Sequence, residues 1–221
     1  MYLQTGLMMN LNTNWLLDQG KDSDTLVLFA HGAGADMHSD FMADYATLLS
    51  ANGPSVLRFN FPYMVKRGED GKRRPPDRAP ALLQAFEQTL AAAVAEFAPK
   101  RLFLMGKSMG GRMAAMLAAN DKLAMTPSGV ICLGYPFLPP KKTEPRLEPL
   151  WECASPLLIL QGERDSFGKR EQLASWALPE QAKVRFITDG DHSFVPRKSS
   201  GTDLKANLQD AVKESLLFIG S

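Results

Sequence analysis

Short runs of consecutive apolar residues recur along the chain and alternate with longer segments in which apolar residues are spaced by three or four. The first run, residues 25–30, is almost wholly apolar and ends at a turn that contains glycine. A continuous apolar run of this length is typical of a strand buried on both faces of a sheet. The same pattern predicts further strands at residues 55–60, 101–106, 129–134, 156–162 and 183–188.

Amphipathic helices are predicted between these strands. Residues 81–98 carry apolar side chains at spacings that place them on one helical face: Leu83, Phe86, Leu90, Val94 and Phe97. A similar pattern predicts a last helix over residues 202–219, where Thr202 or Asp203 can cap the N-terminus. Other helices are predicted at residues 39–51, 109–120 and 168–178.

This alternation predicts an α/β fold with a mostly parallel central sheet and helices on both faces, because consecutive parallel strands need a crossover connection. Ligands of such folds bind beyond the carboxyl ends of the strands. The length of the chain suits one domain spanning residues 1–221, with residues 1–23 as an N-terminal extension or edge strands.

Two stretches depart from the alternation. Residues 65–80 are charged and rich in proline and glycine, which predicts a long loop. Residues 136–150 are rich in proline, which excludes a regular helix over their length. The second stretch is also too short to form a lid domain, so we expect an open site.

Composition excludes several classes of protein. Apolar residues make up 45% of the chain and charged residues 22%, and the formal net charge of +1 gives no reason to expect nucleic acid or a membrane as partner. The two cysteines predict neither a disulfide framework nor a metal site. Residues 1–20 lack the features of a secretory leader, and no apolar run approaches the ~20 residues of a membrane span. We therefore expect a cytoplasmic monomer or homodimer that acts on a small molecule.

The strongest chemical motif follows the predicted strand at residues 101–106. The sequence GKSMG at residues 106–110 matches G-x-S-x-G, in which a serine occupies the sharp turn between a strand and a helix. Its two glycines are needed because a Cβ at either position would collide with neighbouring backbone. Ser108 is therefore predicted to be a nucleophile at the positive end of the next helix. A phosphate-binding P-loop is excluded, because that motif requires glycine where this chain has Arg101.

A serine nucleophile needs a general base, and His192 has the expected position. It lies in a turn between the predicted strand at residues 183–188 and the last helix. Its imidazole would take the proton of Ser108 and later return it to the leaving group. The alternative is a solvated loop histidine without a role in chemistry.

The acid that orients this base should follow the preceding strand, at residues 156–162. Asp165 is the first candidate, and Glu163 is the alternative, although it lies closer to the end of the strand. The order serine, aspartate, histidine along the chain is the one expected with this motif. The sequence thus predicts a triad of Ser108, Asp165 and His192.

An oxyanion hole requires two backbone N–H donors close to the nucleophile. Met109, the residue after the serine, is expected to supply one of them. The other is expected in the loop after the first parallel strand, where Ala33 is the first candidate and Gly34 the second. His31 is expected to anchor this turn rather than to act as a second base.

Substrate contacts are expected near the strand ends. The candidate walls are aromatic or apolar side chains, each of which could instead pack in the core: Tyr63, Met64, Tyr135, Phe137, Phe167 and Phe194. The basic loop at residues 65–80 should lie on the same side of the sheet. It is either a solvated loop or, through Arg73 and Arg74, a clamp for a carboxylate or phosphate of the substrate.

Five short motifs stand out along the chain: HGAG at residues 31–34, FPY at 61–63, RPP at 74–76, GKSMGGR at 106–112 and GDHSF at 190–194. From about residue 24 to 219, the chain resembles the small α/β-hydrolases related to dienelactone hydrolase. Within them it is similar to a subgroup of bacterial predicted hydrolases and testis-expressed-protein-like domains of eukaryotes. The resemblance implies the α/β-hydrolase fold and the triad of Ser108, Asp165 and His192. Dienelactone hydrolase itself uses a cysteine nucleophile, so dienelactone is not implied as a substrate.

These features favour a cofactor-independent serine hydrolase that cleaves small or medium acyl esters through an acyl-enzyme intermediate. The same groups could act on a thioester or a peptide, or support a haloperoxidase-like side reaction. The remaining alternative is a scaffold or interaction module that keeps the fold without turnover, although such a module does not need all three triad residues.

Overall fold

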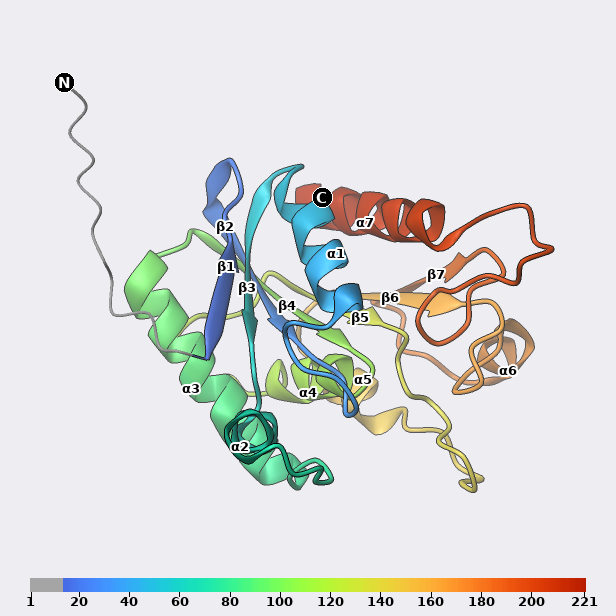
Figure 1. The fold of residues 1–221 in the computed structure, drawn as a ribbon, viewed down its shortest axis with the longest axis horizontal. Coiled ribbons are helices and arrows are strands. Elements are labelled where there is room, and N and C mark those ends of the chain that lie inside the picture. The colour runs from blue at the N-terminus through green and yellow to red at the C-terminus, as the bar shows by residue number, and fades with distance from the viewer. Residues whose placement is uncertain (1–13) are drawn as a thin grey trace.

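A seven-stranded sheet forms the centre of the computed structural model, which describes residues 14–221 (Figure 1). The strand order is β1-β3-β2-β4-β5-β6-β7, with β2 to β7 parallel and β1 antiparallel to β3 at one edge. The strands are β1 (Trp15–Asp18), β2 (Asp22–Ala30), β3 (Pro54–Phe59), β4 (Arg101–Lys107), β5 (Gly129–Leu133), β6 (Leu157–Gly162) and β7 (Ala182–Ile187). All six predicted strands are confirmed. The expectations for residues 1–13, as an extension or edge strand without a leader, lie outside the described residues.

Helices cover both faces of the sheet, as the alternation predicts (Figure 1). One face packs against α1 (Asp40–Ser50) and α7 (Leu204–Gly220). The other packs against α2 (Pro62–Asp70), α3 (Ala79–Phe97), α4 (Met109–Leu117), α5 (Glu148–Glu152) and α6 (Arg170–Ser175). Asp203 caps α7, because its side chain accepts a hydrogen bond of 2.8 Å from the N–H of Ala206. None of the helices in residues 14–221 combines the length and the apolar character of a membrane span.

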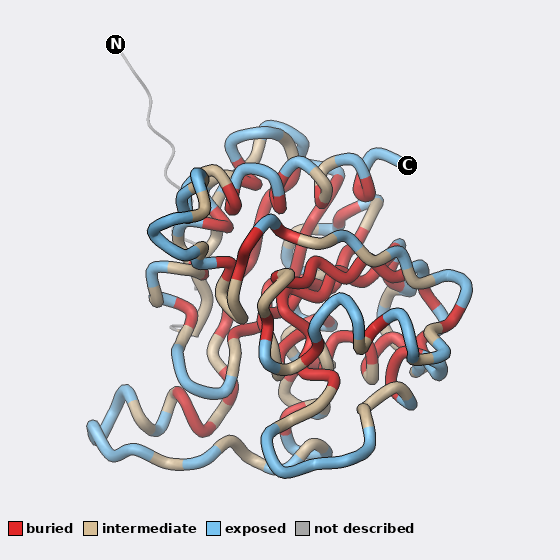
Figure 2. Tube along the Cα trace, turned by 90° about the vertical axis from the view of Figure 1, so that its right-hand side faces the viewer, coloured by how far each residue is buried: buried red, intermediate tan, exposed pale blue. Residues whose placement is uncertain are grey.

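The central strands read as unbroken apolar runs because they are buried on both faces. In β2, Leu28 and the adjacent Phe29 are both fully buried, yet they belong to the cores on opposite faces of the sheet. Figure 2 shows the buried strands in the interior and the exposed loops around them. The sheet is thus a rigid platform whose carboxyl ends carry the connections described below.

The prediction of a loop at residues 65–80 is wrong up to Asp70, because α2 covers residues 62–70. Pro62 suits the first turn of a helix, and the charged residues that suggested a loop are also good helix formers. Gly71, with φ of 68°, ends the helix in the left-handed conformation. At residues 136–150 the expected irregular structure extends to Leu147, and the connection from β5 to β6 carries only the short helix α5. No lid domain is therefore inserted there.

Candidate active site

Ser108 occupies a strained turn between β4 and α4. Its φ of 51° and ψ of −113° lie in a region that residues with a side chain rarely adopt. A Cβ at Gly106 would overlap the backbone of Gly110 and Gly111, and a Cβ at Gly110 would overlap the carbonyl of Ala30. The expectation that this turn requires both glycines is confirmed. The turn projects the serine side chain from the carboxyl end of β4, at the N-terminus of α4.

The structure brings the three predicted triad residues together. His192, after β7, places its Nε2 atom 2.9 Å from the Oγ atom of Ser108. Its Nδ1 atom lies 2.8 Å from Oδ2 of Asp165, which follows β6. A carboxylate oxygen only accepts hydrogen bonds, so Nδ1 carries the proton and donates it. Nε2 is then left to accept a hydrogen bond from the serine hydroxyl.

Asp165 is fully buried, and both of its carboxylate oxygens accept hydrogen bonds. Oδ2 also accepts from Nε2 of Gln161 at 2.8 Å, and Oδ1 accepts from the N–H of Phe167 at 2.8 Å. These bonds fix the carboxylate that contacts Nδ1 of His192. The alternative acid, Glu163, accepts hydrogen bonds from Arg170 and from the N–H of Asp189 instead. Glu163 is therefore a support of the loop rather than a partner of His192.

Lys107 is a site residue that the sequence did not single out. Its Nζ atom donates a hydrogen bond of 2.6 Å to the backbone oxygen of His192 and lies 5.4 Å from the centre of the Phe41 ring. Burial lowers the pKa of Lys107 to about 8. Its position directly before the nucleophile was the only signal in the sequence, and it does not reveal a contact with a residue that is 85 positions away.

The loop expected to supply an oxyanion donor is held by His31 and Tyr63. The His31 Nε2 atom accepts a hydrogen bond of 3.0 Å from the N–H of Phe61, so Nδ1 carries the proton and donates to the Gly32 oxygen at 2.7 Å. Burial lowers the pKa of His31 to about 4, which keeps the ring neutral. The Tyr63 hydroxyl lies 3.2 and 3.1 Å from the carbonyl oxygens of Gly32 and Ala33. The expected anchoring role of His31 is confirmed.

The candidate oxyanion donors belong to residues that line the space around Ser108. Across residues 14–221, neither the N–H of Met109 nor that of Ala33 or Gly34 has a hydrogen-bond partner. Ala33 lines the space on both sides of Ser108, and Met109 lines one of them. Both N–H groups are thus available to an oxyanion.

Two pockets meet at Ser108. The first, about 350 Å³, has mostly apolar walls that include Phe41 and Met42. The second, about 300 Å³, lies on the side of α3 and α4 and is lined by Asp77, Arg112 and Arg146 among others. Both pockets share Ala33, Ser108 and Phe167. A substrate with two arms can therefore place one arm in each pocket.

Most of the expected substrate walls lie elsewhere. Phe167 lines both pockets, with its ring centre 4.5 Å from that of His192. The other five candidates are buried and line neither pocket: Tyr63, Met64, Tyr135, Phe137 and Phe194. Their positions near strand ends were read correctly, but their side chains turn inward and close the core. The sequence missed Phe41, Met42 and Arg146, whereas Arg112 follows Ser108 by one helical turn and could have been found.

The two arginines proposed as a clamp lie outside both pockets. Arg73 is exposed, and Arg74 forms an ion pair of 2.7 Å with Asp70. The loop does approach the site, but through Pro76 and Asp77 rather than through its arginines.

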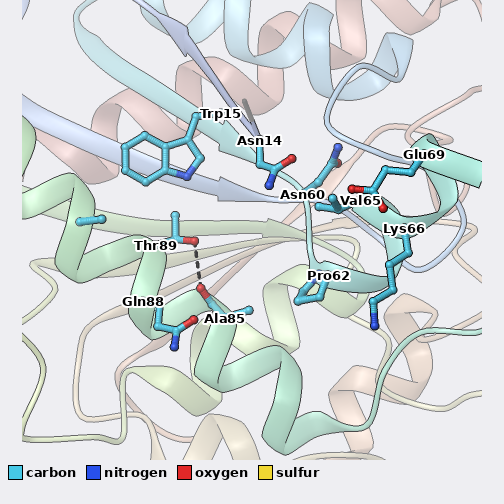
Figure 3. A pocket seen from close by; sticks show the side chains of 11 residues that line it. Asn14, Trp15, Asn60, Pro62, Val65, Lys66, Glu69, Ala85, Gln88 and Thr89 are labelled. Atoms are coloured by element: carbon cyan, nitrogen blue, oxygen red, sulfur yellow. Dashed lines mark hydrogen bonds between the residues drawn. The ribbon is translucent and has the colours of Figure 1, made fainter. Parts of the chain in front are cut away.

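A separate pocket of about 510 Å³ lies beside β1, α2 and α3, where it is lined by Trp15, Pro62 and Thr89 among others (Figure 3). None of the predicted site residues lines it. Among the side chains of residues 14–221, no three or more His, Cys, Asp or Glu are grouped as the ligands of a metal ion would be.

A nucleophile elbow on a parallel sheet that is covered on both faces is the arrangement of an α/β hydrolase. The family model described as an alpha/beta hydrolase domain matches residues 23–220. The chain belongs to this family. No curated protein matches the sequence significantly.

Solved structures agree with this fold. An α/β serine hydrolase homologue from Coxiella burnetii is similar with a TM-score of 0.66 and 20% identity, over 91% of this chain and 90% of the other. A lid-less α/β serine hydrolase from Xanthomonas campestris is similar with a TM-score of 0.64 and 20% identity, over 91% of this chain and 88% of the other. Dienelactone hydrolase from Anabaena variabilis gives 0.69 and 19%, over 92% and 90%. The expected likeness to dienelactone hydrolase is thus confirmed for the fold.

Proposed function

We propose that this protein is a serine hydrolase that cleaves small or medium acyl esters through an acyl-enzyme intermediate. The observation that carries this proposal is the continuous chain of hydrogen bonds from buried Asp165 through His192 to Ser108, at 2.8 and 2.9 Å. A serine hydroxyl becomes a nucleophile when an oriented imidazole can take its proton. The fold alone would not require these three side chains to meet.

The proposed reaction starts with attack of Oγ of Ser108 on the ester carbonyl, while Nε2 of His192 takes the hydroxyl proton. The N–H groups of Met109 and Ala33 would stabilise the negative charge on the carbonyl oxygen. Asp165 would stabilise the imidazolium through the bond to Nδ1. Collapse of the tetrahedral intermediate breaks the bond to the alcohol, which leaves with the proton from His192. Water then attacks the acyl-enzyme with His192 as base, and the acid and the free serine are released.

The size of the substrate is inferred from the pockets at Ser108. Volumes of about 350 and 300 Å³ suit the two arms of a small or medium ester. Among the structural neighbours, one is an esterase domain from Rhodothermus marinus, at 16% identity and a TM-score of 0.62. Est1E from Butyrivibrio proteoclasticus has been solved with ferulic acid bound, and it matches at 16% identity and a TM-score of 0.66. These relatives support an ester as the first substrate class to test.

A fluorophosphonate probe tests the proposal directly, because it reacts covalently only with an activated serine. We expect the wild type to be labelled, and we expect Ser108→Ala and His192→Ala to abolish labelling. Ser175→Ala, which removes an exposed serine hydroxyl on α6, should be labelled like the wild type. Rates on matched ester, thioester and amide substrates then identify the bond that is cleaved. A folded wild type that is not labelled would favour the alternative hypothesis of a scaffold or interaction module without turnover.

A further inference from the structure

We propose that Arg112 and Arg146 form a binding site for a carboxylate of the substrate, so that the enzyme prefers esters that carry a free carboxylate. This inference rests on the proposed ester hydrolysis and adds the substrate class. It starts from the second pocket at Ser108, of about 300 Å³, which both arginines line.

Arg112 is placed beside the nucleophile by helix geometry. Its N–H donates a hydrogen bond of 3.1 Å to the carbonyl oxygen of Ser108, so it lies one turn further along α4. Residues four apart project from the same face of a helix, and their side chains tilt towards its N-terminus. The guanidinium of Arg112 is thereby directed to the side of α4 on which the serine lies, and it is half-buried there.

Arg146 reaches the same pocket from the irregular segment before α5. Its N–H donates to the Phe137 oxygen at 2.7 Å, and its own oxygen accepts from the Tyr135 hydroxyl at 3.0 Å. The backbone that carries this arginine is thus tied to the core. Burial, and then the positive charge of Arg112, lowers the pKa of Arg146. Two guanidinium groups therefore share one partly buried space.

The charge of these two arginines is not balanced by a direct partner. Over the described part of the chain, neither guanidinium forms an ion pair or a side-chain hydrogen bond, whereas Arg58, Arg74 and Arg197 are each paired with an aspartate. Like charges that are held together away from bulk water repel each other. An anion between the two groups would remove that repulsion, and a guanidinium is suited to bind a carboxylate through two parallel hydrogen bonds.

The third charged group of the pocket limits the charge of the ligand. Asp77 lines the same pocket. The charged side chains of the pocket are therefore two arginines and one aspartate, and their formal charges add up to +1. A singly charged carboxylate neutralises this sum, whereas a doubly charged phosphate would be repelled by Asp77. The pocket on the other side of Ser108 has mostly apolar walls, although Lys107 also lines it. The substrate inferred from both sides is an ester with one apolar arm and one arm that ends in a carboxylate.

Matched pairs of esters test this preference on either arm. For the acyl arm, the para-nitrophenyl monoester of glutaric acid is compared with para-nitrophenyl pentanoate. For the alcohol arm, 4-acetoxybenzoate is compared with its methyl ester. In at least one pair we expect kcat/KM of the wild type to favour the carboxylate by about tenfold or more.

Three variants connect the preference to the pocket. Arg112→Gln and Arg146→Gln should each bring the ratio within a pair close to one, and Arg112→Lys should restore part of it. Arg185→Gln removes the same charge from exposed β7, where the arginine pairs with Glu214, and should keep the wild-type ratio. Thermal unfolding verifies that all variants are folded.

The outcomes separate this inference from the proposed function. Hydrolysis that depends on Ser108 but proceeds at equal rates within both pairs would overturn the carboxylate site and leave the hydrolase intact. Stronger inhibition by inorganic phosphate than by pentanoate, which carries one carboxylate, would overturn the assignment to a singly charged group. If no ester is hydrolysed, calorimetric titration of Ser108→Ala with pentanoate, a singly charged carboxylate, decides. Binding to Ser108→Ala that is lost in Ser108→Ala/Arg112→Gln would support the carboxylate site without the hydrolase activity. Absence of binding at ~10 mM would overturn both the carboxylate site and the proposed ester hydrolysis.

Discussion

The ammonium group of Lys107 donates a hydrogen bond of 2.6 Å to the backbone oxygen of His192. Lys107 is the last residue of β4, and His192 follows β7, so this bond joins the turn that carries Ser108 to the loop that carries His192. The contact is partly buried, and bonds from a charged donor are stronger than those between neutral groups. We therefore predict that Lys107 positions the proposed triad.

Replacement of Lys107 by methionine tests this role. The change leaves the His192 oxygen without its donor, and we expect kcat to fall by about tenfold with a smaller change in KM. Because burial lowers the pKa of Lys107 to about 8, wild-type activity should decline above that pH as the ammonium loses its proton. Lys107→Met should lack this decline, and Lys183→Met, at an exposed position, should keep it. An unchanged alkaline limb in Lys107→Met would contradict the assignment.

Asp165→Asn separates the two candidate acids. The amide keeps the shape of the carboxylate but favours the wrong tautomer of His192 and no longer stabilises the imidazolium. We expect kcat for an ester to fall by about a thousandfold or more. Glu163→Gln changes a residue that contacts Arg170 and Asp189, so its kcat should stay within about threefold of the wild type. Comparable losses in the two variants would show that Asp165 has no special role.

Backbone strain at Ser108 predicts a gain in stability when function is removed. The φ of 51° and ψ of −113° are more accessible to glycine than to residues with a Cβ. Ser108→Gly should therefore have a free energy of unfolding about 1 kcal/mol above that of Ser108→Ala. Both variants should fail to react with the probe. Denaturation in urea measures the difference, and equal stabilities would mean that the turn is not strained.

The lowered pKa of His31 should make the free energy of unfolding depend on pH. The pKa of its ring is lowered from the usual 6.5 to about 4 by burial, so between these values the unfolded chain binds a proton that the folded protein does not. The free energy of unfolding should therefore fall as pH drops from 6.5 to 4, with His31 contributing about 3 kcal/mol. His31→Leu should be less stable at pH 7 by about 2–4 kcal/mol, because Gly32 and Phe61 lose their partner.

The slope of stability against pH is the decisive measurement for His31. His31→Leu should lose this part of the slope, whereas His38→Leu, at an exposed position, should keep it. Urea denaturation between pH 4.5 and 7 gives the slopes. The same slope in wild type and His31→Leu would exclude His31 as its source.

The strands and the predicted triad residues could be found from the sequence, because both depend on local patterns of residues. The strands could be found because burial on both faces leaves an unbroken apolar run, and the triad residues could be found because each follows a strand at the same edge of the sheet. On α3, the predicted stripe faces the core: Phe86 and Leu90 are buried, and Leu83, Val94 and Phe97 are partly buried against the same cluster. The sequence pattern missed that Leu82 and Ala93 are buried as well.

Contacts between distant segments leave no local pattern in the sequence. The walls of the two pockets depend on whether a side chain near a strand end turns into the core, as Tyr135 does, or over the site, as Phe167 does. Arg146 reaches the nucleophile only through the path of an irregular segment. The helix α2 was missed because its charged residues are compatible with either a loop or a solvent-exposed helix.

The order of strands has a consequence for the way in which the protein folds. Ser108 and His192 are 84 residues apart, and their loops lie side by side only after β4, β5, β6 and β7 have assembled in turn. Contacts over such distances form late, because the entropy cost of closing the intervening loop comes before the energy gained from the contact. In a refolding experiment, the time at which the probe first reacts should therefore mark the docking of β7, while β1 at the opposite edge can pair before or after that event.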